Sequence, residues 1–164
     1  MVDTVSQEQR AWNVAASVLD PEVPAVTVAD LGILRSIELT GENRVVVRVT
    51  PTYSGCPAVL AIEKAIEAAL LDAGFDPLIE RVMSPAWTTD WVTDEGREKL
   101  RQYGIAPPVA DSKSARALFG KPQVPCPRCA STATTRISEF GSTACKALYK
   151  CDECHEPFDY FKCI

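Results

Sequence analysis

The stretch RVVVRVTPTYSGCPAVLAIEKAIEAALLDAG, residues 44–74, decides the fold of the amino-terminal part of the chain. Its first residues alternate, which predicts a strand with three valines on one face: Val45, Val47 and Val49. Apolar side chains then recur at helical spacing, which predicts a helix that packs on the sheet through Val59, Ile62, Ile66 and Leu70. Pro57 suits the first turn of that helix, and Gly74 suits the left-handed cap that ends it. Cys56 therefore lies at a junction between a strand and a helix.

The flanking residues complete a small α+β unit. ILRSIEL, residues 33–39, is separated from the valine-rich strand by TGEN, which is typical of a hairpin. SQEQRAWNVAASVL, residues 6–19, predicts an opening helix that Asp20-Pro21 ends. LIERVM, residues 78–83, predicts a third strand, and TDEGREKLRQYG, residues 93–104, predicts a further helix. We expect a small mixed sheet packed with helices.

Composition and charge narrow the classes of protein. The chain has 164 residues, of which 46% are hydrophobic and 24% charged, as in ordinary globular proteins. The formal net charge is −5, with 11 Lys and Arg against 17 Asp and Glu in residues 1–120 (−6), and 6 against 5 in residues 121–164 (+1). This acidic balance argues against nucleic acid as the main partner. No signal-like or membrane-spanning run is visible, so a cytoplasmic protein without a membrane partner is expected.

Six of the seven cysteines lie near the carboxyl end. CPRC, Cys126 to Cys129, and CDEC, Cys151 to Cys154, are two C-x-x-C pairs separated by 21 residues. This spacing predicts a β-rich zinc ribbon in which a closed four-cysteine site is structural. A redox pair and an iron-sulfur cluster are the alternatives. Since both pairs occur together at ribbon spacing, zinc is the preferred interpretation.

Three residues of the ribbon have no assigned ligand position. Cys145 and Cys163 are expected to be small buried hydrophobic side chains. His155, the single histidine of the chain, could replace a cysteine ligand, but a partly exposed position at the tip is preferred. With this histidine in the ribbon, neither a Ser-His-Asp nor a Cys-His arrangement can readily be built in the larger domain. No glycine-rich phosphate loop is present either, so no ordinary hydrolase or nucleotide enzyme is indicated.

The domain limits follow a change of composition after residue 105. Residues 1–105 are assigned to the α+β domain, and 122–164 to the zinc ribbon. The intervening residues, 106–121, are rich in Pro, Ala, Ser and Lys without a sustained period, which predicts a linker with one helical turn around 115–119.

The residues around Cys56 leave two interpretations open. A helix amino terminus favours the thiolate form of a nearby cysteine, and Gly55 lets the backbone turn closely there. An inert, buried thiol explains the residues alone equally well. Asp20 and Asp30 are similarly explained by helix and turn capping.

Three motifs, DPEVP (residues 20–24), ADLG (29–32) and TPTYSGCP (50–57), occur in order and together resemble the family of iron-sulfur assembly factors. This family includes SufT and the eukaryotic cytosolic iron-sulfur targeting factor, and the resemblance covers roughly residues 8–83. It implies that Cys56 handles iron or an iron-sulfur cluster. The same motifs contribute further residues to that site, namely Asp20, Glu22, Asp30 and Thr50.

The rest of the chain is similar to the PaaD branch of that family. PAWTTDWVTDEGREKLRQYGIAPP, residues 85–108, and the ribbon motifs EFGSTACKALYKC and CHEPFDYFKC carry this resemblance. The branch implies an accessory, non-enzymatic maturation factor of a bacterial phenylacetyl-CoA epoxidase, which acts in phenylacetate degradation. The implied partners are the epoxidase subunits, especially the iron-sulfur flavin reductase, with a homo-oligomer also open. Iron or a cluster would be a transient cargo, and zinc a structural cofactor.

Three rival functions and one local question stay open at this point. The rivals are a structural or regulatory oxygenase subunit with an inert Cys56, a zinc-ribbon nucleic-acid-binding protein, and a thiol enzyme. Trp87 and Trp91 lie four residues apart, so packing of a shared helical face onto the core is preferred to an aromatic patch that binds a partner.

Overall fold

The chain divides between Thr93 and Asp94 into two units, which are described separately. The structure is a computed structural model that describes residues 4–109 and 123–162. The helical turn expected around residues 115–119 lies outside these ranges, and so does Cys163.

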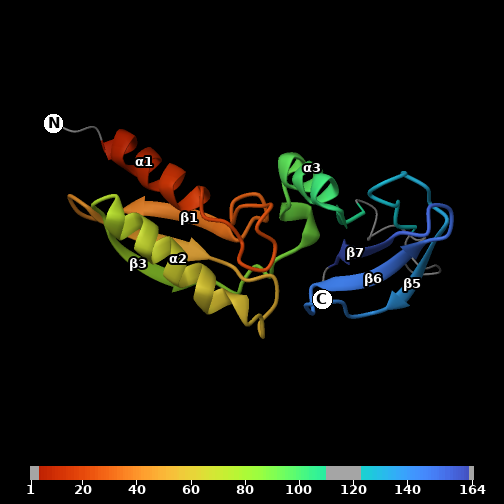
Figure 1. Cartoon of the computed structure of the whole chain (residues 1–164). Helices are drawn as coiled ribbons and strands as arrows, with labels where there is room; N and C mark the ends of the chain where they lie inside the picture. The colour runs from red at the N-terminus through yellow and green to blue at the C-terminus, as the bar shows by residue number, and fades with distance from the viewer. Residues whose placement is uncertain (1–3, 110–122, 163–164) are drawn as a thin grey trace. The chain divides into compact units, whose positions relative to one another are not determined.

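The amino-terminal unit is built on a three-stranded mixed sheet with the order β1-β2-β3 (Figure 1). β1 (Leu34–Leu39) and β2 (Arg44–Val49) form the expected antiparallel hairpin, whereas β3 (Asp76–Arg81) pairs with β2 in parallel. α1 (Thr4–Ala16) packs on β1 and on α2 (Ala58–Asp72), and α2 packs on β3. The helix–strand order predicted from the sequence and the α+β class are therefore confirmed.

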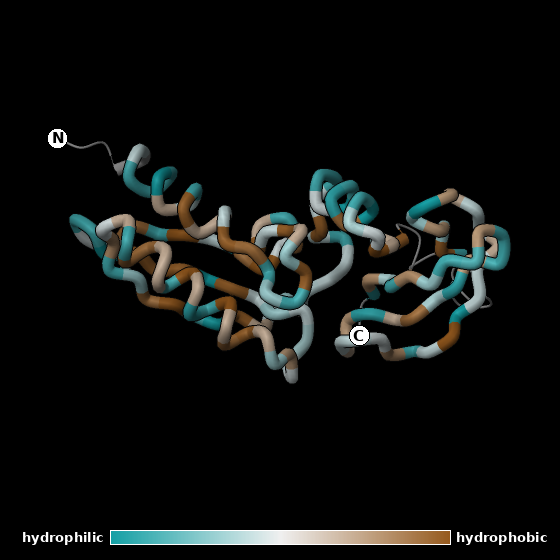
Figure 2. Tube along the Cα trace, in the orientation of Figure 1, coloured by the Kyte–Doolittle hydropathy of each residue, from teal (hydrophilic) through white to brown (hydrophobic). Residues whose placement is uncertain are grey.

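The core of this unit lies between α2 and the sheet. Val45, Val47 and Val49 are at most 1% exposed, and the predicted stripe of α2 is buried along its whole length. Figure 2 shows hydrophobic residues recurring along both β2 and α2. The strand period of two and the helix period of three to four thus meet in one apolar layer, as the sequence predicts.

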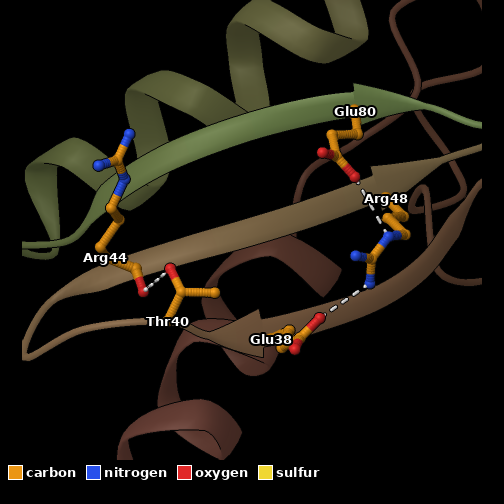
Figure 3. Close-up of polar contacts among 5 residues, drawn as sticks. All are labelled: Glu38, Thr40, Arg44, Arg48 and Glu80. Atoms are coloured by element: carbon orange, nitrogen blue, oxygen red, sulfur yellow. Dashed lines mark hydrogen bonds and ion pairs between the residues drawn. The ribbon is translucent and has the colours of Figure 1, made fainter.

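The other face of the sheet carries charged side chains. Figure 3 shows Arg48 of β2 reaching Glu38 of β1 and Glu80 of β3, with both N–O distances at 3.2 Å. At the hairpin end, the hydroxyl of Thr40 donates a hydrogen bond to the carbonyl oxygen of Arg44 at 3.3 Å. One arginine therefore connects all three strands across a half-exposed surface.

The segment that contains Trp87 and Trp91 closes this unit against the ADLG motif. The indole Nε1 of Trp87, which is buried, donates a hydrogen bond to the carbonyl oxygen of Leu31 at 2.7 Å. Only the short 3-10 helix η1 (Thr89–Trp91) forms here, so the expectation that Trp87 and Trp91 share a helical face is wrong. Gly32 has a φ of +71°, and a Cβ atom on it would lie 2.6 Å from Cβ of Trp91. Glycine is required at this position by its conformation and by this close approach.

In the described residues of the carboxyl-terminal unit, 94–109 and 123–162, there are one α-helix and a four-stranded sheet. α3 (Asp94–Tyr103) is the predicted helix, and the strands are β4 (Ile105–Ala106), β5 (Thr134–Ser138), β6 (Lys146–Cys151) and β7 (Pro157–Phe161). Their order is β4-β7-β6-β5, with β5 and β7 antiparallel to β6, and β4 parallel to β7.

Aromatic residues and cysteines share the core of this unit. The ring of Tyr149 stacks on Phe158 with a centroid distance of 5.8 Å and meets Tyr160 edge-on at 5.6 Å. Cys126 and Cys151 belong to the same buried cluster. Since part of the proposed linker, 106–121, lies outside the described residues, the domain limits drawn from the sequence stay a prediction. No helix in the described ranges is both long and apolar enough for a membrane span.

Candidate functional site

The four ribbon cysteines sit on two turns that have the same backbone pattern. In the first, the N–H of Cys126 donates to the carbonyl oxygen of Ser131; in the second, the N–H of Cys151 donates to that of Glu156, both at 2.9 Å. The residue after the second cysteine of each turn has a positive φ, 62° at Ala130 and 64° at His155. Both turns therefore fold back so that their two thiols point the same way.

The four thiols gather at one point. The Sγ atoms of the four cysteines all lie within 4.8 Å of one another. Two of the separations are 3.7 Å, between Cys126 and Cys154, and 3.5 Å, between Cys129 and Cys151. A tetrahedral zinc ion with Zn–S bonds of about 2.3 Å separates its sulfur ligands by about 3.8 Å. The arrangement fits a four-thiolate zinc site without a large movement of the backbone.

The surroundings of Cys129 and Cys151 shift the pKa values of their thiols in opposite directions. The N–H of Cys154 points at Sγ of Cys151, with an N–S distance of 3.5 Å, and lowers the pKa of Cys151 to about 7. At Cys129 the N–H of Ser131 favours the thiolate, but the neighbouring thiol of Cys151 and burial outweigh it, so the pKa of Cys129 is raised to about 12. A bound metal cation would lower the pKa of Cys129 as well, because its charge stabilises several neighbouring thiolates at once.

The additional ribbon residues lie outside this group. His155 is exposed, lies within the second turn directly after Cys154, and is not a member of the four-thiol group. Cys145 is buried, and its Sγ lies 3.1 Å from Oγ1 of Thr143. The preferred expectations for these two residues, a partly exposed tip histidine and a small buried thiol, agree with these positions.

Cys56 lies immediately before α2 in a tight turn. Its N–H donates to the carbonyl oxygen of Tyr53, and its own carbonyl oxygen accepts from the N–H of Val59, both at 3.3 Å. The thiol is half-buried and free of a disulfide. Pro57 is the N-cap residue and provides no side-chain cap. Backbone geometry thus holds Cys56 next to a helix start, and the residue as a whole is not fully buried.

Two of the four polar residues that the resemblance adds to Cys56 act as turn caps. Oδ1 of Asp20 accepts from the N–H groups of Glu22 and Val23, both at 2.8 Å. Oδ2 of Asp30 accepts from the N–H of Thr27, whose hydroxyl accepts from the N–H of Asp30, both at 3.0 Å. Both aspartates are buried, so the capping interpretation describes how they are used in this fold.

The other two, Glu22 and Thr50, differ in exposure. Glu22 is half-buried, whereas Thr50 is only 1% exposed, and its N–H donates to the carbonyl oxygen of Ile33 at 2.8 Å. Within residues 4–109 and 123–162, only the ribbon cysteines form a group of three or more His, Cys, Asp or Glu able to hold a metal ion. The fold therefore does not assemble Cys56 and these carboxylates into a ready metal cage.

One polar feature near the ADLG motif was missed from the sequence. The guanidinium carbon of Arg35 lies 3.6 Å from the ring centroid of Trp91. The two residues are 56 positions apart, and no local pattern connects them. Only the docking of the η1 segment onto residues 30–32 brings them together.

Comparisons with known protein families divide the chain in two. Residues 8–74 match a family described as iron-sulfur cluster assembly protein. Residues 110–162 match a family described as PaaD zinc beta ribbon domain. The carboxyl-terminal part is thus a zinc ribbon with four cysteines close together.

A relative resembles nearly the whole chain. It is an Escherichia coli (strain K12) protein named as a subunit of a "Putative 1,2-phenylacetyl-CoA epoxidase". The two are 52% identical over 159 residues, which are 96% of this chain and 94% of the relative.

Comparison with solved structures gives matches over part of the chain. A Bacillus anthracis domain of unknown function, DUF59, is 21% identical with a TM-score of 0.55; the match covers 59% of this chain and 93% of that domain. This likeness shows a shared fold. A Mycobacterium tuberculosis protein associated with Fe-S complex assembly and repair is 31% identical over 60% of this chain and 84% of its own, with a TM-score of 0.34.

Proposed function

Since the chain belongs to the PaaD family of 1,2-phenylacetyl-CoA epoxidase subunits, we propose that it is an accessory maturation factor of such an epoxidase in phenylacetate degradation. It assists delivery of iron or an iron-sulfur cluster to the oxygenase or its reductase subunit, and it carries out no step of the epoxidation. The setting is cytoplasmic, and the iron-sulfur flavin reductase is the preferred client.

The observation that carries this proposal is the position of Cys56. It is a free, half-buried thiol beside the start of α2, inside the region that matches iron-sulfur cluster assembly proteins. A single cysteine on a partly exposed residue suits transient binding because the remaining ligands come from the cargo or the client. Asp20 and Asp30 stabilise their own turns through the backbone hydrogen bonds described above, and Glu22 and Thr50 belong to the same three motifs as Cys56.

In this proposal the ribbon has a structural role. Cys126, Cys129, Cys151 and Cys154 hold a zinc ion, which supplies a structural cross-link between the two turns. Because protein thiolates fill all four positions, the ribbon presents a surface and performs no chemistry.

The test compares Cys56→Ser with wild type during production of the epoxidase. Each chain is co-expressed with the reductase subunit, and the iron-sulfur content of the purified reductase is measured. We expect cluster content to fall about tenfold with Cys56→Ser, the order seen when a metal-site contact is lost. One zinc per chain should be retained in both. Ser54→Ala, in the same loop and exposed, is the matched control and should leave cluster content unchanged.

A second candidate is a structural or regulatory subunit with an inert Cys56. The engagement of Asp20 and Asp30 in capping favours it, because one oxygen of each carboxylate already accepts backbone N–H groups. Equal loading of the reductase with wild type and Cys56→Ser would reject metal delivery through Cys56 and would favour this candidate.

A further inference from the structure

Arg35 is held in an unusual position on the amino-terminal unit. The pairing of β1 with β2 shifts register between Leu34 and Ser36, so Arg35 lies at a β-bulge. Bulges redirect side chains away from the regular alternation of a strand. Here the guanidinium stacks on Trp91 at 3.6 Å, while the Arg35 residue as a whole is exposed and Trp91 is half-buried.

The aromatic surface below Arg35 is fixed in place. The N–H of Trp91 donates to the carbonyl oxygen of Thr88 at 3.1 Å, and the N–H of Thr93 donates to that of Asp30 at 2.8 Å. Gly32 lets the backbone of Trp91 approach closely. Stacking on Trp91 already restricts the side chain of Arg35 before a ligand binds. Arg35 therefore loses little further conformational entropy on binding.

The other arginines of this unit are already engaged. Arg48 and Arg81 form ion pairs with glutamates, Arg44 forms one with Asp76, and Arg10 donates to the carbonyl oxygen of Ala73. Among the described residues, Arg35 has the stacking contact with Trp91 and no ion pair with a carboxylate. Its N–H donors are therefore available to an oxyanion from outside.

We propose that Arg35, stacked on Trp91, binds a carboxylate side chain of an epoxidase subunit and anchors this chain to it. The inference rests on the proposed function, since it names how the same partner is recognised. A protein carboxylate is preferred to a phosphate for two reasons. The acidic balance of residues 1–120 opposes a doubly charged phosphate more strongly than a singly charged carboxylate, and Arg and Trp are residue types enriched among the hot spots of protein interfaces.

The experiment measures the Kd of the full-length chain for the purified epoxidase subunits by biolayer interferometry. We expect Arg35→Gln to raise the Kd about tenfold or more, because the charged fork is lost. Arg35→Lys should give an intermediate value, since an ammonium group keeps the charge but not the paired donors. Arg48→Gln is the matched control on the same sheet and should stay within about twofold, as its partners are intramolecular.

The outcomes separate this inference from the function it rests on. If wild type binds the subunits and Arg35→Gln binds equally well, the anchor is rejected and the proposed function stands. If wild type binds none of them, both fail. Titration with inorganic phosphate and with coenzyme A, followed by tryptophan fluorescence, tests whether Arg35 binds a phosphate instead. A saturable change that Arg35→Gln abolishes would assign the site to phosphate and overturn the carboxylate proposal.

Discussion

Gly32 is the residue on which the closure of the amino-terminal unit depends most directly. Gly32→Ala introduces a Cβ atom 2.6 Å from Cβ and 2.7 Å from the carbonyl oxygen of Trp91, at a φ of +71°. Left-handed strain and overpacking together should reduce the free energy of unfolding by roughly 3 kcal/mol. Urea unfolding followed by tryptophan fluorescence measures this, because all three tryptophans, Trp12, Trp87 and Trp91, lie in this unit.

Gly74→Ala is the control for backbone conformation alone. Its φ is +90°, but nothing lies within 4 Å of the added Cβ atom. It should cost only about 1 kcal/mol, the strain of a left-handed alanine. Equal losses in the two variants would show that the contact with Trp91 is unimportant.

At Cys56 the sequence predicts the local setting and not the surroundings. A proline-started helix after a valine-rich strand places the thiol at a helix start, and the structure has it there. Which side chains lie near it is a property of the tertiary fold, and no local pattern in the sequence connects Cys56 with Asp20 or Asp30. The same applies to Arg35 and Trp91, which no period or motif connects. The sequence around a residue predicts its local backbone geometry. Contacts between residues that are distant in the sequence can be known only from the tertiary fold.

At the scale of elements, the two cysteine turns carry strain that can be removed. Ala130 and His155 have left-handed conformations, with φ of 62° and 64°, at positions where glycine has no steric penalty. Ala130→Gly and His155→Gly should each stabilise the zinc-loaded ribbon by about 0.5–1 kcal/mol, since relief of strain exceeds the added entropy of the unfolded chain. Chelator competition for zinc would show this as tighter retention.

Ala133→Gly gives the opposite sign and serves as the control. Ala133 lies close to the first turn but has no positive φ, so glycine adds only unfolded-state entropy. It should weaken zinc retention slightly. If all three glycine variants weakened it, the strain attributed to the turns would not exist.

The elements that could not be predicted from the sequence are short, or they depend on contacts with distant segments of the chain. β7 is only five residues long, and β4 has two residues whose strand character depends on pairing with β7. η1 is held by a capping hydroxyl from Thr88 and by its contact with the ADLG loop rather than by an apolar period. By contrast, α2 and β2 were predictable because each buries one face over many residues.

At the scale of the molecule, the two units have different sources of stability. The amino-terminal unit packs α1 and α2 on a sheet with continuous apolar layers. The core of the ribbon is small, and two of its buried members, Cys126 and Cys151, belong to the four-cysteine group. Loss of the metal would therefore destabilise the hydrophobic core of the ribbon directly. The core of the amino-terminal unit contains none of these four cysteines and would not be affected in this way.

Removal of zinc should consequently unfold one unit and spare the other. A strong chelator at neutral pH removes a contribution of roughly 10 kcal/mol or more, which exceeds what so small a core can replace. Hydrogen exchange read by mass spectrometry should then show loss of amide protection across residues 123–162, with residues 4–93 and tryptophan fluorescence unchanged. Cys129→Ser should reproduce this effect in part, because three thiolates still bind zinc, whereas Ser142→Ala, an exposed change in the same unit, should not. Protection that persists in the ribbon without metal would contradict a structural zinc, and protection lost in both units would show that they unfold together.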